Sequence, residues 1–199
     1  MIKPILVVKV DGKMVYEGES KSLLQNFAKA LLTILSSPGS GVTTSTSIGA
    51  TVNFFGEWYA GTYYGGGVHL AMNALSGDDS FGIVVGSGTT NVSPTDSSLA
   101  SKISNGTGSG QLSYQTHTTN SSFSSSSSFI QISRTFINNS GANVVVREVG
   151  LIARNFFRDN WGVKNDAKIL IARDVLPNPV TVKPLGSLNV TYTLSLSVS

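Results

Sequence analysis

Histidine, cysteine and clustered carboxylates do much of the chemistry in proteins, and this chain is poor in them. It has no cysteine, which excludes disulfides, thiolate zinc sites and cysteine nucleophiles. Its two histidines, His69 and His117, form neither a His-x-His nor a His-Glu-x-x-His motif. Asp78 and Asp79 are adjacent, whereas a calcium loop normally takes several alternating oxygen ligands. The sequence therefore predicts no metal site.

Two further patterns resemble functional motifs without completing them. Gly86-Ser87-Gly88 follows a strand-like run, as a phosphate-binding loop does, but no Gly-Lys-Ser/Thr and no long helix follow it. Serine is abundant, yet no Gly-x-Ser-x-Gly elbow is present. We therefore interpret Gly86 to Gly88 as a turn beside a strand end. We expect no cofactor and no enzyme; a hydrolase is the third alternative for the function.

Five charged residues stand within runs that otherwise have strand composition. They are Arg134, Arg147, Glu148, Arg173 and Asp174. Because Glu148 can pair with an arginine on a neighbouring strand and so fix the strand register, we interpret the five as structural ion pairs. Ligand binding or an interface role is the alternative.

The elements that must position these residues are strand-like, most clearly in the last third of the chain. From Leu188 to Val198, apolar and polar residues alternate without a break, which predicts a half-buried strand. Two further runs, Phe129 to Ile137 and Val144 to Ala153, flank Asn138-Asn139-Ser140-Gly141. Because Asn and Gly tolerate the positive φ of hairpin turns, we expect a hairpin there.

The short apolar run Ile169 to Ala172 is followed by Arg173-Asp174 and then by Pro177 and Pro179. Proline lacks a backbone donor, so we expect ladder pairing to end there, at a turn or an edge. Upstream, Phe81 to Gly86 predicts a buried strand.

The segments between Gly88 and Phe129 are polar. Ser93 to Asp96, followed by Leu99, Ala100 and Ile103, predicts a capped single helical turn. Residues 105–128 are low in complexity, and by themselves they bury too little surface to order. Within a sheet, the same residues could form a polar strand held by its neighbours.

The N-terminal region predicts a hairpin and a helix. Ile5 to Val10, Asp11-Gly12 and Met14 to Tyr16 have the pattern of a small hairpin. From Ser20 to Leu35, apolar residues recur at helical spacing, with Ser22 and Gln25 as a capping box. This amphipathic helix packs on the sheet or contacts a neighbouring subunit, and the pattern leaves both open.

A glycine-rich segment between Asn53 and Gly67 contains six aromatic residues. They are the candidate interface residues: Phe54, Phe55, Trp58, Tyr59, Tyr63 and Tyr64. Trp and Tyr combine a large apolar area with a polar group, so the segment suits an exposed contact surface. We expect it to project from the domain and contact another subunit; the alternatives are a loop folded over its own core and a platform for stacking on glycans.

Composition points to one mainly β domain. The chain has 199 residues, only 13% of them charged, with 21 glycines and many Ser, Thr and Asn. The 14 Lys and Arg are scattered, so we expect no nucleic acid as a partner despite a net charge of +3. We also expect no membrane span, because no apolar run approaches about 20 residues, and no export signal, because the N-terminal apolar run Ile5 to Val8 is too short for a signal peptide.

Several segments, in this order, resemble small structural proteins of tailed phages and of viruses that infect thermophilic prokaryotes. The segments are Val84 to Thr90, Ser93 to Asp96, Leu99 to Ile103, Arg134 to Gly141, Val146 to Leu151 and Ala172 to Leu176. The resemblance covers roughly Phe81 to Ser199 and implies no active site. It implies a β-sandwich or jelly-roll module in the virion that decorates a head or builds a spike, turret, collar or tail.

From these observations we expect a single domain over residues 1–199, an antiparallel β-sandwich of jelly-roll type. Residues 1–38 would form a hairpin–helix arm, and residues 53–67 the projecting aromatic loop. The resemblance implies assembly with further copies of the chain and with other virion proteins. The alternative function is a host-receptor or carbohydrate-binding module, with host surface glycans as the ligand.

Overall fold

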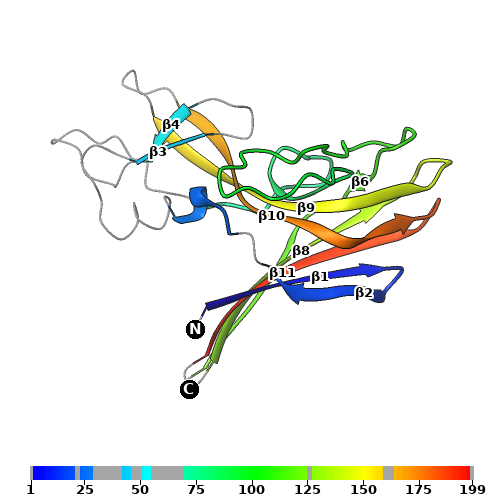
Figure 1. Ribbon diagram of the computed structural model, residues 1–199, viewed down its shortest axis with the longest axis horizontal. Helices are drawn as coiled ribbons and strands as arrows, with labels where there is room; N and C mark the ends of the chain where they lie inside the picture. The colour runs from blue at the N-terminus through cyan, green and yellow to red at the C-terminus, as the bar shows by residue number, and fades with distance from the viewer. Residues whose placement is uncertain are drawn as a thin grey trace.

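The computed structural model describes residues 2–20, 23–28, 42–45, 51–54, 70–124, 127–158 and 164–197. This part of the chain is mainly β, and the strands of each sheet pair antiparallel (Figure 1). The strands are β1 (Ile2–Val10), β2 (Lys13–Glu19), β3 (Val42–Ser45), β4 (Thr51–Phe54), β5 (Gly82–Gly86), β6 (Ser113–Tyr114), β7 (Thr118–Phe123), β8 (Ser127–Ile137), β9 (Val144–Arg158), β10 (Lys164–Val182) and β11 (Ser187–Ser197).

The large sheet has the order β2-β1-β11-β8-β6, and β7 also pairs with β8. The predicted N-terminal hairpin is confirmed: Asp11 and Gly12 connect β1 and β2 with φ of 47° and 77°, the positive values that a two-residue hairpin turn needs. β1 then pairs with β11 from Ile2↔Leu196 to Val10↔Leu188, so the first and last strands are neighbours.

A smaller sheet has the order β10-β9-β5, and β3 pairs with β4 in a third sheet. In the view of Figure 1, β9 and β10 lie above β11, β1 and β2. Both larger sheets contribute to one hydrophobic core, for example with Val8 and Val190 on one side and Val149 and Ile171 on the other. β5 is buried along its whole length, as predicted.

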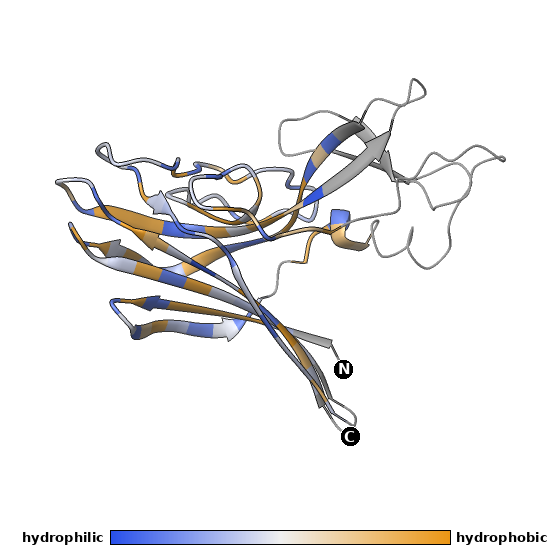
Figure 2. Cartoon of the chain, turned by 180° about the vertical axis from the view of Figure 1, so that it is seen from behind, coloured by the Kyte–Doolittle hydropathy of each residue, from blue (hydrophilic) through white to orange (hydrophobic). Residues whose placement is uncertain are grey.

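The predicted alternation in the last strand is confirmed over the side chains that are described. Leu188 and Val190 are fully buried and Tyr192 nearly so, while Asn189 and Thr191 are half-exposed. Figure 2 shows the same alternation of apolar and polar residues along the strands. One face of β11 therefore belongs to the core.

The hairpin predicted from the turn signal after Ile137 is wrong. β8 pairs with β11, β6 and β7 in the large sheet, whereas β9 pairs with β10 and β5 in the small one. The connection is a crossover between sheets, fixed by the buried Asn138, whose Nδ2 donates to the carbonyls of Ala142 and Val182 at 2.8 Å each. Its Oδ1 accepts a hydrogen bond from Ser140 N at 3.0 Å.

The expected end of pairing at the prolines is confirmed only in part, because residues 176–179 have no partner on β9 but pairing resumes at Val180. β10 continues to Val182, and Pro177 and Pro179 are exposed within a register shift between Val175 and Val180. An edge was one of the two expected settings, and β10 is an edge strand, where a missing backbone donor costs little.

Two helical predictions fare differently. Ser93 to Asp96 forms a single capped turn, in which Asp96 N donates to the Ser93 carbonyl at 3.0 Å and Ser93 N donates to Asp96 Oδ2 at 2.9 Å. The turn is not helical, and Leu99 and Ile103 are buried from an irregular segment, so the prediction is confirmed only in part. Of the predicted N-terminal helix, only residues 25–28 are helical in the described part, and Leu23 forms a β-bridge with Ala172. The predicted start at Ser20 is therefore not confirmed, and Ser22 and residues 29–35 lie outside the described residues.

Candidate functional site

Glu148, in β9, is the centre of a buried polar network. Its side chain is fully buried, and Oε1 accepts hydrogen bonds from Ser101 N at 2.7 Å and Gly88 N at 3.1 Å. Oε2 accepts from Ala100 N at 3.2 Å and from Arg173 Nε at 2.8 Å. The carboxylate therefore ties the loop after β5 and the segment around Ala100 to the small sheet.

Arg173, in β10, completes this network. Its Nη1 donates to Asp96 Oδ2 at 2.8 Å, and its Nη2 donates to the carbonyl and the hydroxyl oxygen of Thr90 at 3.0 Å each. Burial lowers the pKa of Arg173, but hydrogen bonds to Asp96 and Glu148 outweigh it and leave the pKa above its usual value. The guanidinium thus stays charged between two carboxylates.

The Gly86-Ser87-Gly88 turn has a structural use in this network. The backbone amide of Gly88, which a phosphate could have bound, is occupied by Glu148. A Cβ placed on Gly86 or Gly88 would clash with the Glu148 carboxylate, so the turn needs glycine for this close approach.

Arg134, in β8, is the centre of a second network and is almost completely buried. Its guanidinium donates to the backbone carbonyls of Leu75, Asp78, Phe81, Ile83 and Gln115. It also lies 4.7 Å from the centre of the Tyr114 ring. Burial lowers its pKa to about 10, so Arg134 remains charged at neutral pH and gathers two segments of backbone.

His117 belongs to the same region and is buried. Its Nε2 accepts a hydrogen bond from Ile83 N at 2.7 Å, so Nδ1, 3.2 Å from the carbonyl oxygen of Ala74, carries the proton. Burial, assisted by the charge of Arg134, lowers the pKa of His117 to about 4. His69 lies outside the described residues.

The remaining carboxylates considered in the sequence also bind the chain itself. Asp78 Oδ1 accepts from Ser80 N at 2.9 Å, and Asp79 accepts from Asn105 N at 2.7 Å and from Lys102 Nζ at 3.0 Å. No group of three His, Asp or Glu side chains within the described ranges could hold a metal ion.

The five charged residues singled out in the sequence are thus divided among different settings. Glu148 and Arg173 form an ion pair, and Arg134 binds carbonyls. Asp174 accepts hydrogen bonds from Ser20 Oγ and Tyr192 OH at 2.9 Å each, and Arg147 is half-exposed on β9, outside both networks. Sequence reasoning missed Asp96, because its place after Ser93-Pro94 has the pattern of a local helix cap.

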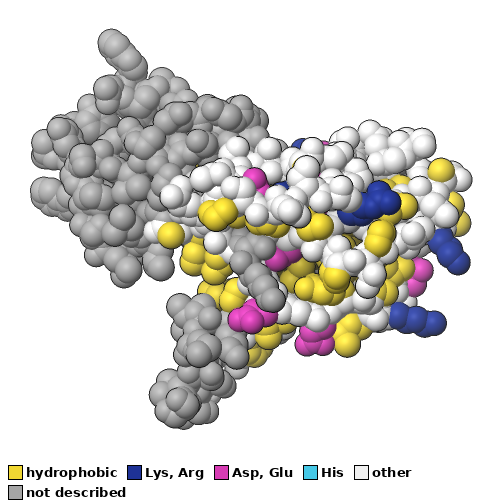
Figure 3. Space-filling model, in the orientation of Figure 1, with side chains coloured by type: hydrophobic (Ala, Val, Ile, Leu, Met, Phe, Trp, Pro, Cys, Tyr) yellow, Lys and Arg dark blue, Asp and Glu magenta, His cyan; other side chains and the backbone are white. Residues whose placement is uncertain are grey.

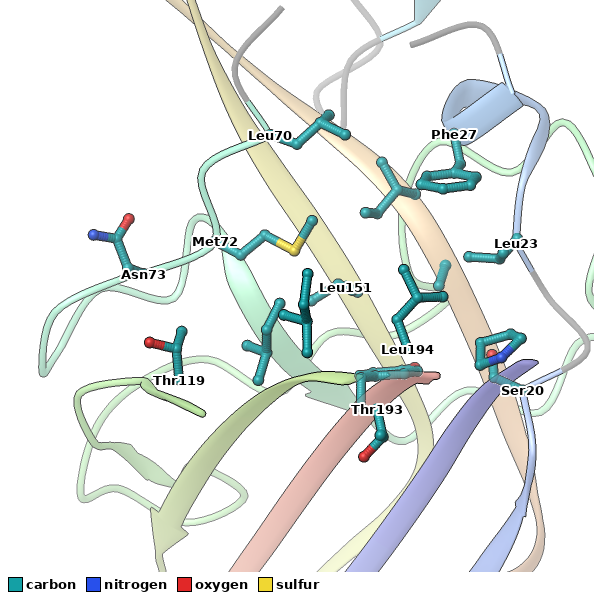
Figure 4. A pocket seen from close by; sticks show the side chains of 16 residues that line it. Ser20, Leu23, Phe27, Leu70, Met72, Asn73, Thr119, Leu151, Thr193 and Leu194 are labelled. Atoms are coloured by element: carbon teal, nitrogen blue, oxygen red, sulfur yellow. The ribbon is translucent and has the colours of Figure 1, made fainter. Parts of the chain in front are cut away.

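An apolar pocket of about 380 Å³ lies where the inner faces of the two larger sheets meet residues 23–27 and 70–73 (Figure 4). Leu194 and Ile132 line it from the large sheet, and Leu151 and Ile171 from the small one. No charged side chain lines it among the described residues. Figure 3 shows apolar side chains gathered on this face of the molecule. The pocket offers mainly apolar contact area.

The six aromatic candidate interface residues lie almost wholly beyond what the structure describes. Phe54 ends β4, and Phe55, Trp58, Tyr59, Tyr63 and Tyr64 lie outside the described residues. Their role in contacts between subunits stays a prediction.

Comparison with protein-family models, curated proteins and solved structures finds no match to this chain. In the described part of the chain, no helix has the length and apolar character needed to cross a membrane.

Proposed function

We propose that this chain is a structural protein of a virion, which assembles with copies of itself and with other virion proteins. Its place would be that of a capsid decoration, a spike or turret, a collar or a tail component. The observation that carries the proposal is the convergence of the segments that resemble such proteins on one buried network.

The convergence joins segments far apart in sequence. Five of the resembling segments contribute residues to the network. Glu148 and Arg173 are hydrogen-bonded to each other, and between them they bind the other members, which are Gly88, Thr90, Asp96, Ala100 and Ser101. Chance similarity between short segments would not require them to meet in space. The contact gives these residues a shared structural role, which is what motifs of a structural protein would have.

The fold supports the same proposal. We infer that the two larger sheets form a β-sandwich of jelly-roll type, because both are antiparallel and share one hydrophobic core. Two buried networks attach the irregular segments between β5 and β8 to these sheets. A module of this kind keeps its surface shape when many copies repeat one interface.

The proposal is tested by measuring assembly and location. Sedimentation velocity of the full chain over a range of concentrations, with negative-stain microscopy, should show a defined oligomer or lattice. Gold-labelled antibody against the chain should decorate particles purified from an infected culture. A chain that is monomeric at every concentration, with no labelled particles, would overturn the proposal, as would saturable binding to cell-envelope glycans without assembly.

A further inference from the structure

The edges of the sheets are where another chain could add a strand, because an edge strand presents unpaired N–H and C=O groups. In the described part, the two larger sheets have their edges at β2 and at β7 with β6, and at β10 and β5. Three of these edges carry features that discourage pairing with another chain.

The β2 edge is charged and irregular. It carries Lys13, Glu17 and Glu19, and its register with β1 shifts between Val8 and Lys9. Charged residues and bulges are the usual means by which proteins protect an edge strand.

The edges of the small sheet are covered by the chain itself. On β10, Leu24 N donates to the Ile171 carbonyl at 2.9 Å, and the exposed Pro177 and Pro179 lack a donor. On β5, Ile103 N donates to the Val85 carbonyl at 2.9 Å. Both edges are therefore closed to a further strand over these residues.

The β7 edge has none of these features. All six residues from Thr118 to Phe123 are exposed, and none is charged or a proline. β7 pairs with β8 without a register shift, from Thr118↔Ser133 to Phe123↔Ser128. No strand of the described part pairs with its outer side. At its end, Phe123 is 72% exposed, among the most exposed large apolar side chains of the described part.

We propose that β7 pairs with β7 of a second copy, antiparallel and about a two-fold axis, so that two large sheets join into one. The inference rests on the proposed function and names the surface and the partner through which assembly begins. A two-fold axis requires a self-complementary strand. Thr-Thr-Asn-Ser-Ser-Phe meets that requirement because neutral residues face neutral residues in either register, centred on Asn120 or on Ser121.

Regular pairing with β8 strengthens the choice of a second copy. Without a bulge, backbone groups alternate strictly between β8 and the outer side, so an antiparallel copy can bond along the whole strand. β2 lacks this regularity because of its register shift. A stable pairwise interface buries about 1,200–2,000 Å² of surface, and a strand of six residues from each copy buries less than that. A single β7 contact is therefore weak, and it gains strength when many such contacts form in a lattice.

Hydrogen exchange on the unmodified chain gives the first test. Backbone amides of residues 118–123 should exchange more slowly as the protein concentration rises, while those of β2 should not change. Oligomers that form without this protection would overturn the β7 inference and leave the proposed function standing. Absence of any oligomer would overturn both. Protection that appears only with added cell-envelope glycans would also overturn the inference.

Charge substitution gives the second test. Ser121→Lys and Ser121→Asp should each weaken self-association about fivefold, because like charges then lie close to each other across the axis. An equimolar mixture of the two variants should restore association. Ser109→Lys, on an exposed loop, is the matched control and should associate like the unmodified chain. Failure of the mixture to recover, with both variants folded, would count against pairing at β7.

Discussion

At the scale of the residue, the two charged groups at the centres of the buried networks act mainly on the chain's own backbone. Glu148 accepts hydrogen bonds from three backbone amides and one guanidinium, and Arg134 donates to five carbonyls. Within the described residues, no buried side-chain nitrogen or oxygen lacks a hydrogen-bond partner. Removal of one member of such a network leaves buried partners unsatisfied, which costs more than the net value of the pair.

Glu148→Gln should therefore lower the free energy of unfolding by about 3 kcal/mol, because it leaves the Arg173 guanidinium buried with only Asp96 as its ionic partner. Urea unfolding at neutral pH measures the change. The control is Asp166→Asn, which breaks the partly exposed Arg154–Asp166 pair and should cost less than about 1 kcal/mol. Equal losses in the two variants would contradict a buried network.

His117 should make stability depend on pH. Its pKa is about 4 in the folded chain against 6.5 in the unfolded one, so the unfolded chain binds the extra proton between these values. The contribution of His117 to the free energy of unfolding is fully present above about pH 6.5. It is lost as the pH falls from 6.5 to about 4, and it does not change further below pH 4. The full loss should be about 3 kcal/mol, most of it reached by pH 4.5.

The test compares the chain with His117→Gln, whose amide can accept from Ile83 N and donate to the Ala74 carbonyl without titrating. Urea unfolding of both proteins at pH 7 and pH 4.5 separates the histidine from the carboxylates, which titrate in both. The same pH dependence in both proteins would show that His117 is not buried in its neutral form.

At the scale of the element, β11 shows how one strand serves two surfaces. Its inner face fills the core with Val190 and Tyr192, while the outer face makes polar contacts across to β8, such as Ser133 Oγ to Thr191 Oγ1 at 2.7 Å. Leu194 lies on the inner face but is only half-buried, because it lines the apolar pocket. The core is therefore most sensitive at the middle of the strand.

Val190→Asp should abolish folding, since it places an unpaired carboxylate among fully buried apolar side chains. Thr193→Asp, on the opposite face of the same strand, should change the melting temperature little. Circular dichroism melts of the soluble fractions measure both. If the two variants were equally stable, the assignment of inner and outer faces would be wrong.

At the scale of the whole molecule, the large sheet joins the two ends of the described chain. β1 pairs with β11 along its full length, and Leu6 and Val8 are completely buried. The N-terminal hairpin is therefore part of the large sheet and its core.

Deletion of residues 1–19 should leave a chain that does not unfold cooperatively. Burial of Leu6 and Val8 alone contributes about 3 to 6 kcal/mol, a large share of the about 5 to 15 kcal/mol that holds a typical domain. Met14→Ser, at a side chain 58% exposed on β2, is the control and should melt like the unmodified chain. A truncated chain with an unchanged melting temperature would show that the hairpin is a dispensable arm.

Local patterns in the sequence were sufficient for the β11 strand, the buried β5 strand and the Asp11-Gly12 hairpin. In each case the signal and the structure lie within a few residues, since side-chain alternation and positive φ are local properties. The charge pairing of Glu148 with an arginine could also be anticipated, because a buried carboxylate needs a cation or donors close by.

Tertiary structure alone decided which sheet each strand joins and which partners the charges find. Asn138 to Gly141 has the composition of a hairpin turn, yet β8 bonds to β11 and β9 to β10, because long-range pairing outweighs a local turn preference. The prolines predicted a turn or an edge, and only the sheet order shows that they lie on an edge strand, along which β10 continues past them. Asp96 reaches Arg173 only once the loop after β5 folds onto the small sheet, and that contact exists only in the assembled core.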